Sequence, residues 1–253
     1  MGISLSVNLN KIALIRNSRE GNYPDVVEHA RVCIANGADG ITVHPRPDQR
    51  HIRPNDVRQL SQLTSPLDDI EFNIEGNPFA EENGSYPGLF QLAEETRPDQ
   101  CTLVPDNDNQ LTSDHGFDLT QTGDNLAPII ERLKSYGIRV SLFMDPDLAQ
   151  IELAKQVGAD RIELYTGPYA EAWGDPKKLE SIFQQHYIAA SLAQDLGLGV
   201  NAGHDLSLVN LEKFSAIPGL AEVSIGHALT VDAIALGLDK AVRAYNSILK
   251  SKN

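Results

Sequence analysis

The sequence predicts a TIM barrel, (β/α)8, formed as a single domain over residues 1–253. Short runs rich in Val, Ile and Leu alternate eight times with helical patterns. Titratable residues stand at the ends of several runs, where barrel enzymes carry their sites. No linker or low-complexity stretch interrupts the chain. A doubly wound open sheet is the alternative, but the segment 8–11 after the first run is not the glycine-rich phosphate loop of that fold.

The strand candidates are unbroken or nearly unbroken apolar runs, as expected for parallel strands covered on both faces. They are 3–7, 39–43, 70–74, 100–104, 138–143, 160–164, 198–201 and 222–225. Helical patterns follow them near 24–36, 55–63, 87–96, 124–136, 147–157, 177–196, 207–216 and 230–250.

Local signals define several helix boundaries. Asp145-Pro146 and Asp175-Pro176 each predict an N-cap followed by proline at the first helical position. Gly37 and Gly158 each stand where a helix should end. Ser207 is expected to cap the helix near 207–216.

Composition excludes several classes of partner. The net charge of −14 repels nucleic acid and anionic membranes, so any anionic substrate must be bound by local cations or backbone amides. No apolar run approaches the roughly 18 residues that span a bilayer. The two cysteines, Cys33 and Cys101, are expected to be buried free thiols in a reducing compartment. The chain begins in its first strand, which leaves no room for a signal peptide and predicts a cytoplasmic protein.

Four titratable residues follow strand candidates and should share one site at the barrel mouth, namely His44, Glu75, His204 and His227. Burial at the mouth raises the pKa of a carboxyl group, so Glu75 is expected to act as a general base, with an ion pair to an arginine as the alternative. Glu163 points either into the barrel or toward its mouth, and Arg139 is a candidate partner for it.

Two loops have the composition of phosphate sites. His44 to His51 contains two arginines and two histidines, which indicates an anion clamp or, alternatively, a solvated charged loop. The glycines in Ala202–Asp205 and Ser224–His227 follow the seventh and eighth strands, where barrels bind phosphate through backbone amides.

Histidines and a glutamate at a barrel mouth are also compatible with a divalent metal. The first strand is followed by Asn8-Leu9-Asn10 rather than by a His-x-His pair, which favours a site without metal. A Schiff-base enzyme requires a lysine near a strand end, and Lys11 is the candidate.

Motifs in order along nearly the whole chain resemble pyridoxine 5′-phosphate synthases. They are Val7–Ala13, Arg16–Arg19, Gly37–His44 with Arg46 and Arg50-His51, Leu103–Pro105, Val200–His204 and Ile225–His227. The resemblance implies a homo-octamer of TIM barrels that works without metal or organic cofactor. It implies condensation of 3-amino-2-oxopropyl phosphate with 1-deoxy-D-xylulose 5-phosphate to pyridoxine 5′-phosphate, phosphate and water.

The resemblance also implies roles for individual residues. By motif position, His44, Glu75 and His204 match catalytic residues, and Glu163 matches a transition-state stabiliser. Positions that hold the deoxyxylulose phosphate are matched by Asn8, Asn10, Arg19, Arg46, His51 and Thr112. The site of the second substrate is matched by Asp205, Gly226 and His227.

Three features depart from the family pattern. Asn10 and Lys11 stand where Asp-His is frequent, which leaves their substrate contacts open. Asp205 replaces a common glycine and adds a charge beside a phosphate. The segment 76–86 is expected to form an enlarged loop.

Ring closure from an amine and two carbonyl compounds requires proton transfers at every step, and imidazole and carboxyl groups can supply them. Two other functions remain open on the sequence alone. One is a metal-dependent lyase or isomerase acting on a sugar phosphate, and the other is a barrel that binds a phosphosugar without catalysis.

Overall fold

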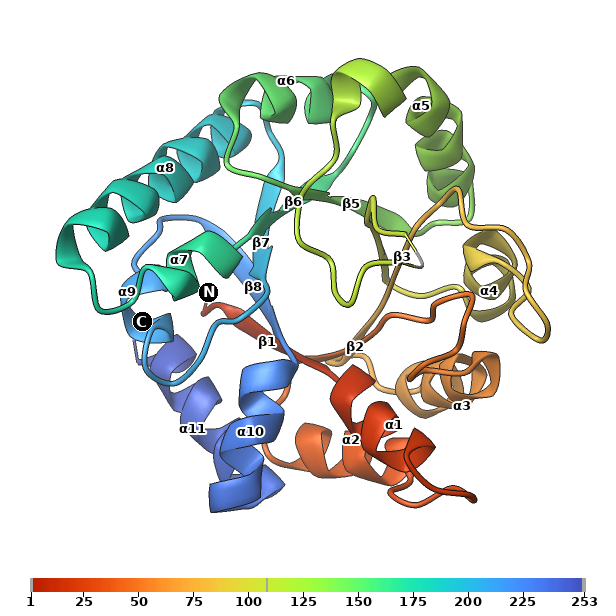
Figure 1. Ribbon diagram of the computed structural model, residues 1–253. Helices are drawn as coiled ribbons and strands as arrows, with labels where there is room; N and C mark the ends of the chain where they lie inside the picture. Colours follow the sequence, from red (N-terminus) through yellow and green to blue (C-terminus); the bar gives the residue numbers. More distant parts are fainter. Residues whose placement is uncertain (1, 108, 252–253) are drawn as a thin grey trace.

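The computed structural model describes residues 2–107 and 109–251 and contains a closed barrel of parallel strands (Figure 1). Each strand pairs in parallel with the next along the chain, and the last pairs with the first. The strands are β1 Ser4–Asn8, β2 Gly40–Val43, β3 Glu71–Gly76, β4 Gln100–Leu103, β5 Arg139–Met144, β6 Arg161–Tyr165, β7 Gly199–Gly203 and β8 Leu220–Ile225. The predicted TIM-barrel fold is confirmed.

Helices surround the barrel as an outer ring (Figure 1). They are α1 Asn10–Asn17, α2 Val26–Ala35, α3 Pro54–Thr64, α4 Leu89–Thr96, α5 Leu119–Ser135, α6 Leu148–Gln156, α7 Gly167–Glu171, α8 Pro176–Asp195, α9 Leu211–Phe214, α10 His227–Leu236 and α11 Leu238–Lys250. Within the described residues, the helices are too short or too polar to cross a membrane.

Several predicted boundaries are confirmed. Asp175 caps α8 by accepting hydrogen bonds from the Lys177 and Lys178 amides, and Pro176 is the first helical residue. Gly37 and Gly158 follow helices with φ of 100° and 93°, a conformation that glycine adopts without steric cost.

Other boundaries are wrong for identifiable reasons. The cap of α6 is Asp147 rather than Asp145. Ser207 does not cap a helix, because its amide donates to the Asn210 side chain in a turn and α9 begins only at Leu211. Gly237, with φ of 87°, divides the predicted helix 230–250 into α10 and α11.

The sequence patterns do not predict α1 and α7, two short helices at the carboxyl ends of β1 and β6. Both lie outside the predicted helical segments. The predicted enlarged loop is confirmed, because the chain from Asn77 to Gly88 contains only an isolated bridge between Asn83 and Tyr86.

The expectation of apolar residues on both faces of the strands is met only on the outer face. Outward residues such as Leu5 and Ile41 are fully buried in the main hydrophobic core. The inner face is polar. Ser6 and Thr42 lie 2.7 Å apart between their hydroxyl oxygens, and Asn73 donates to Thr42 and accepts from Thr102.

Polar contacts continue deeper in the barrel. Asn201 donates to Gln100, and Arg161 donates to Asn201 at 3.0 Å and to Glu222 at 3.4 Å. Burial raises the pKa of Glu222 to about 7, although Arg161 acts in the opposite direction. The interior of this barrel is therefore a hydrogen-bonded polar network rather than the layers of branched apolar residues that fill many TIM barrels.

The two cysteines are buried and unpaired, as predicted. Burial raises the pKa of both thiols to about 12, so the reactive thiolate is scarcely formed at neutral pH.

Candidate active site

A cavity of about 170 Å³ lies at the carboxyl ends of the strands. With the exception of Arg19, every site residue predicted from the sequence lines it. They are Asn8, Asn10, His44, Arg46, His51, Glu75, Thr112, Glu163, His204, Asp205, Gly226 and His227. These residues are far apart in the chain, and closure of the barrel brings them together.

Glu75 and His44 form the centre of the cavity wall. Glu75 lies near the end of β3, His44 follows β2, and Glu75 Oε2 is 3.7 Å from His44 Nδ1. Asn8 Nδ2 donates to the same Glu75 oxygen at 3.3 Å. The side chains of Glu75 and His44 are almost fully buried, with relative exposures of 8% and 5% respectively.

Burial keeps both groups uncharged near neutral pH. It raises the pKa of Glu75 to about 8, and the nearby carboxyl groups of Glu222 and Asp106 act in the same direction. Burial lowers the pKa of His44 to about 3, assisted by Arg46 and Arg50. Near neutral pH a protonated carboxyl group therefore lies beside a neutral imidazole, with 3.7 Å between Glu75 Oε2 and His44 Nδ1.

Glu163 lies on the inner face of β6, below the cavity, with an exposure of 3%. Among the described residues, its Oε2 atom has no hydrogen-bond partner. Burial raises its pKa well above the usual range, with Glu75 and Glu222 as further causes. The expected partner, Arg139, instead pairs with Glu71 and donates to Gln100, so that prediction is wrong.

Gly203, at the end of β7, leaves room for Glu163. A Cβ atom on Gly203 would lie only 2.1 Å from Glu163 Oε1. Position 203 on β7 is therefore glycine because the Glu163 carboxyl group on β6 occupies the space that a side chain would need.

His204 is held by its backbone and by two side chains. His204 and Asp205 have φ of 84° and 60°, in the left-handed region that residues other than glycine rarely adopt. His204 Nε2 is 2.9 Å from Thr112 Oγ1, and its Nδ1 is 3.0 Å from Asp205 Oδ2. The contact with His204 lowers the pKa of Asp205. Asp205 thus orients the imidazole through one nitrogen and leaves the other directed at the segment after β4.

The residues of the predicted anion clamp lie at the cavity, and their role in anion binding stays a prediction. Arg46 and His51 line the cavity, and Arg46 is paired with Asp106 and donates to the Gln110 carbonyl. His51 Nδ1 accepts from the Ile52 amide, and burial lowers the pKa of His51 to about 3. The segment after β4 therefore supplies the counter-charges that hold the clamp.

Arg19 lies outside the cavity, exposed in the bend after α1. Arg16 is the buried arginine of this region, and its guanidinium binds both oxygens of Asp56 and the His51 carbonyl. Arg16 therefore fixes the backbone of the loop that carries His51 rather than binding a ligand.

The opposite side of the cavity is formed by the start of α10. Gly226 precedes this helix, His227 is its first residue, and both line the cavity. Amides in the first turn of a helix have no partner within the helix and attract anions. A Cβ atom on Gly226 would lie 3.0 Å from the Asn8 side chain, which explains the glycine.

The two asparagines at the junction of β1 and α1 have structural contacts. Asn10 Oδ1 accepts from the His44 amide at 2.9 Å, and Asn8 Oδ1 accepts from the Asn10 amide. Lys11 lines the cavity as a cation that the family pattern does not predict.

Sequence reasoning missed Asp106, Ser224 and Phe143. Ser224 and Phe143 line the cavity from inside the barrel. Asp106 is 4% exposed and follows β4, so the rule that found His44 and Glu75 at strand ends should have found it.

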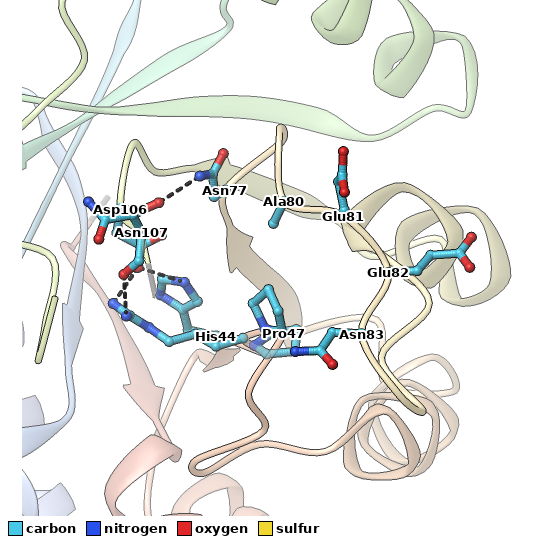
Figure 2. A pocket seen from close by; sticks show the side chains of 11 residues that line it. His44, Pro47, Asn77, Ala80, Glu81, Glu82, Asn83, Asp106 and Asn107 are labelled. Carbon is cyan, nitrogen blue, oxygen red and sulfur yellow. Dashed lines mark hydrogen bonds and ion pairs between the residues drawn. The ribbon is translucent and has the colours of Figure 1, made fainter. Parts of the chain in front are cut away.

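A second cavity, of about 290 Å³, lies on the other side of His44 and Arg46 (Figure 2). It is bounded by Asp106 and by the loop after β3, which contributes Asn77 and Glu82. Figure 2 shows the Asp106 carboxylate between His44 and a guanidinium group, with both contacts dashed. His44 thus forms part of the wall between two cavities.

Across residues 2–107 and 109–251, the His, Cys, Asp and Glu side chains do not gather in groups of three or more with the geometry of a metal site.

Comparison with known proteins identifies the family. The model of the family described as pyridoxal phosphate biosynthesis protein PdxJ matches residues 5–251. A pyridoxine 5′-phosphate synthase of Xanthomonas axonopodis pv. citri (strain 306) is 59% identical over 254 residues, covering 99% of this chain and 98% of that protein. Its counterpart in Xylella fastidiosa (strain M23) is 55% identical over 250 residues, covering 98% and 95%.

Solved structures with little sequence identity share the fold. One is 3-hexulose-6-phosphate synthase from Salmonella typhimurium, with a TM-score of 0.65, 17% identity, and coverage of 99% of this chain and 100% of that one. Another is phosphoribosyl anthranilate isomerase from Thermococcus kodakaraensis, with a TM-score of 0.61, 14% identity and the same coverage. These likenesses establish the barrel, and the family model together with the full-length relatives establishes the family. The chain belongs to the PdxJ family of pyridoxal phosphate biosynthesis proteins.

Proposed function

We propose that this protein is a pyridoxine 5′-phosphate synthase. It condenses 3-amino-2-oxopropyl phosphate with 1-deoxy-D-xylulose 5-phosphate and releases pyridoxine 5′-phosphate, inorganic phosphate and water. Full-length relatives with this name at 55–59% identity support the assignment. The observation at the site that carries it is the buried pair of Glu75 and His44, with 3.7 Å between Oε2 and Nδ1, in a cavity that is also lined by Arg46 and by the first residue of α10, His227.

The chemistry requires repeated proton transfers. Imine formation, loss of phosphate and the dehydrations each take a proton from one atom and give it to another, and positioned acids and bases accelerate such transfers by about 10²–10⁴-fold. Glu75, once its proton has passed to the substrate, is proposed to act as the base for carbon acids in the cavity. His204 lies across the cavity and supplies the second proton donor.

The two phosphates need local positive charge because the whole chain carries −14. Arg46 and His51, with Asn8, Asn10 and Thr112, are proposed to hold the sugar phosphate. Arg19, which the sequence assigns to the same group, lies outside the cavity of a single chain.

The amides around Asp205, Gly226 and His227 are proposed to hold the amino-ketone phosphate. Glu163, buried at the floor of the cavity with an oxygen that has no partner among the described residues, is proposed to stabilise the transition state of the condensation through a hydrogen bond to the reacting groups.

The decisive experiment mixes both substrates with the purified protein and follows the absorbance of pyridoxine 5′-phosphate. Product must appear only when both substrates are present. Absence of product with folded protein would contradict the proposal and favour a barrel that binds phosphosugars without catalysis. Full activity after chelator treatment, with elemental analysis of the same sample, excludes the metal-dependent lyase or isomerase.

We also propose that the protein assembles into a homo-octamer in the cytoplasm. Exposed apolar residues on two neighbouring helices support association, Leu14 and Ile15 on α1 and Val231 and Ile234 on α10. Light scattering at micromolar concentration tests the assembly, and a mass near the 27.6 kDa of one chain would contradict it.

A further inference from the structure

Asp106 occupies a position that the acid–base scheme above does not use. It follows β4, is 4% exposed, and its Oδ2 atom lies 3.3 Å from His44 Nε2. The same oxygen is paired with Arg46 Nη2 and accepts a hydrogen bond from Ser113 Oγ. A single carboxylate therefore contacts both the proposed catalytic imidazole and the proposed phosphate-binding guanidinium (Figure 2).

The backbone of this segment is anchored independently of the carboxylate. The Asp106 carbonyl accepts from Asn77 Nδ2 at 2.6 Å, in the loop after β3. Arg46 Nη1 also donates to the Gln110 carbonyl at 3.0 Å. The Asp106 backbone is thus held by the loop after β3, and Arg46 contacts the segment that follows it.

His44 has two distinct nitrogens in this arrangement. Nε2 faces Asp106, and Nδ1 faces Glu75 and the substrate cavity at 3.7 Å. Because the imidazole is neutral, only one nitrogen carries a proton. A carboxylate beside Nε2 favours the tautomer with the proton there, which leaves a lone pair on Nδ1.

The other charged and titratable groups near His44 favour the same state. Arg46 and Arg50 disfavour a second proton on the ring, and the His51 ring lies with its centroid 6.4 Å away. Glu75, protonated through burial, can donate its hydroxyl proton to a lone pair on Nδ1, so it is compatible with a proton on Nε2.

We propose that Asp106 is a positioning residue that holds the proton of His44 on Nε2, so that Nδ1 is the base directed at Glu75 and the substrate. This inference deepens the proposed function and rests on it for its kinetic consequence. In such a carboxylate–imidazole pair, the carboxylate determines which ring nitrogen carries the proton and does not itself react.

The direct test is the tautomer in the wild-type protein. Magic-angle-spinning 15N spectra of histidine-labelled protein distinguish protonated from unprotonated ring nitrogens at any particle size, and the His44→Gln variant assigns the signal. The expected result is a protonated Nε2 and an unprotonated Nδ1. A proton on Nδ1, or on both nitrogens, would overturn the proposal. The spectra decide this even if the wild type forms no pyridoxine 5′-phosphate, in which case the proposed function fails separately.

Two variants test the consequence for turnover. Asp106→Ala removes the acceptor, so both tautomers should appear and kcat should fall at least about tenfold, with no rise in the KM for the sugar phosphate because Arg46 loses a competing carboxylate. In Asp106→Asn the donors Arg46 and Ser113 select the amide oxygen for the place beside Nε2, so this variant should keep the tautomer and most of the activity.

Glu82→Gln is the matched control, since Glu82 is an exposed carboxylate on the same second cavity and does not contact His44. Its kinetics and spectra should equal those of the wild type. A normal kcat in Asp106→Ala with a raised KM would show that Asp106 serves only Arg46, and would overturn the proposal.

Discussion

Replacement of Glu75 by glutamine should stabilise the protein, and the gain should grow with pH. Burial raises the pKa of Glu75 from 4.5 to about 8, so the folded protein retains a proton that the unfolded chain releases. Between these values the unfolded state binds fewer protons, and the free energy of unfolding of the wild type falls as pH rises. Glutamine cannot ionise and has no such dependence.

The size of the effect follows from the pKa values. Each pKa unit corresponds to about 1.4 kcal/mol. The rise in the Glu75 pKa to about 8 therefore lowers the free energy of unfolding of the wild type by about 5 kcal/mol at pH 8 and by almost nothing near pH 4. Glu163 and Glu222 share the barrel interior, and loss of the charge at Glu75 also relaxes their ionisation. We therefore expect a gain of about 2–5 kcal/mol at pH 8 relative to pH 4.

Urea denaturation followed by circular dichroism, at pH 4.5 and pH 8 and equal protein concentration, measures the difference. Glu82→Gln is the control, because this exposed carboxylate should give the same free energy of unfolding as the wild type at both pH values. The quantity that decides is the free energy of unfolding of Glu75→Gln minus that of the wild type. If this difference is the same at pH 4.5 and pH 8, or is smaller at pH 8, the assignment of a buried, protonated carboxyl group is refuted.

Three further predictions concern activity and binding. Glu75→Gln should bind substrates yet lose kcat at least about a hundredfold in the absorbance assay, and near-normal turnover would remove Glu75 from the role of base. His204→Asn should lower kcat more than it raises KM, because its proton donation is needed mainly in transition states; a change in KM alone would contradict this. Arg46→Ala should weaken binding of 1-deoxy-D-xylulose 5-phosphate about tenfold or more, through loss of a charge-assisted hydrogen bond, and leave binding of 3-amino-2-oxopropyl phosphate nearly unchanged in calorimetry; equal losses would mean that the two phosphate sites are wrongly assigned.

The sequence predicted the barrel and most of its mouth because both depend on a local pattern. Alternation of strands and helices fixes which end of each strand meets the others, so a polar residue at a strand end, such as His44 or Glu75, must face the cavity.

The pairings across the mouth could not be predicted in the same way. Arg46 was expected to be available for phosphate, whereas it is paired with Asp106, 60 residues away in sequence and brought near only by closure of the barrel. Arg19 was expected in the cavity because of its motif, but α1 ends before it and directs it to the surface. Local propensity says nothing about which loop supplies the counter-ion for a given charge.

The polar interior of the barrel has a consequence for how the strands find their alignment. In a barrel with branched apolar residues on both faces of each strand, a slip of one residue exchanges one apolar side chain for another. Here the same slip would turn Thr42 and Asn73 toward the helices and Ile41 and Phe72 into the interior, breaking hydrogen bonds on one side and exposing apolar surface to polar groups on the other. The shear of this barrel is therefore encoded in the alternation along its own strands, and misaligned closures are penalised during folding.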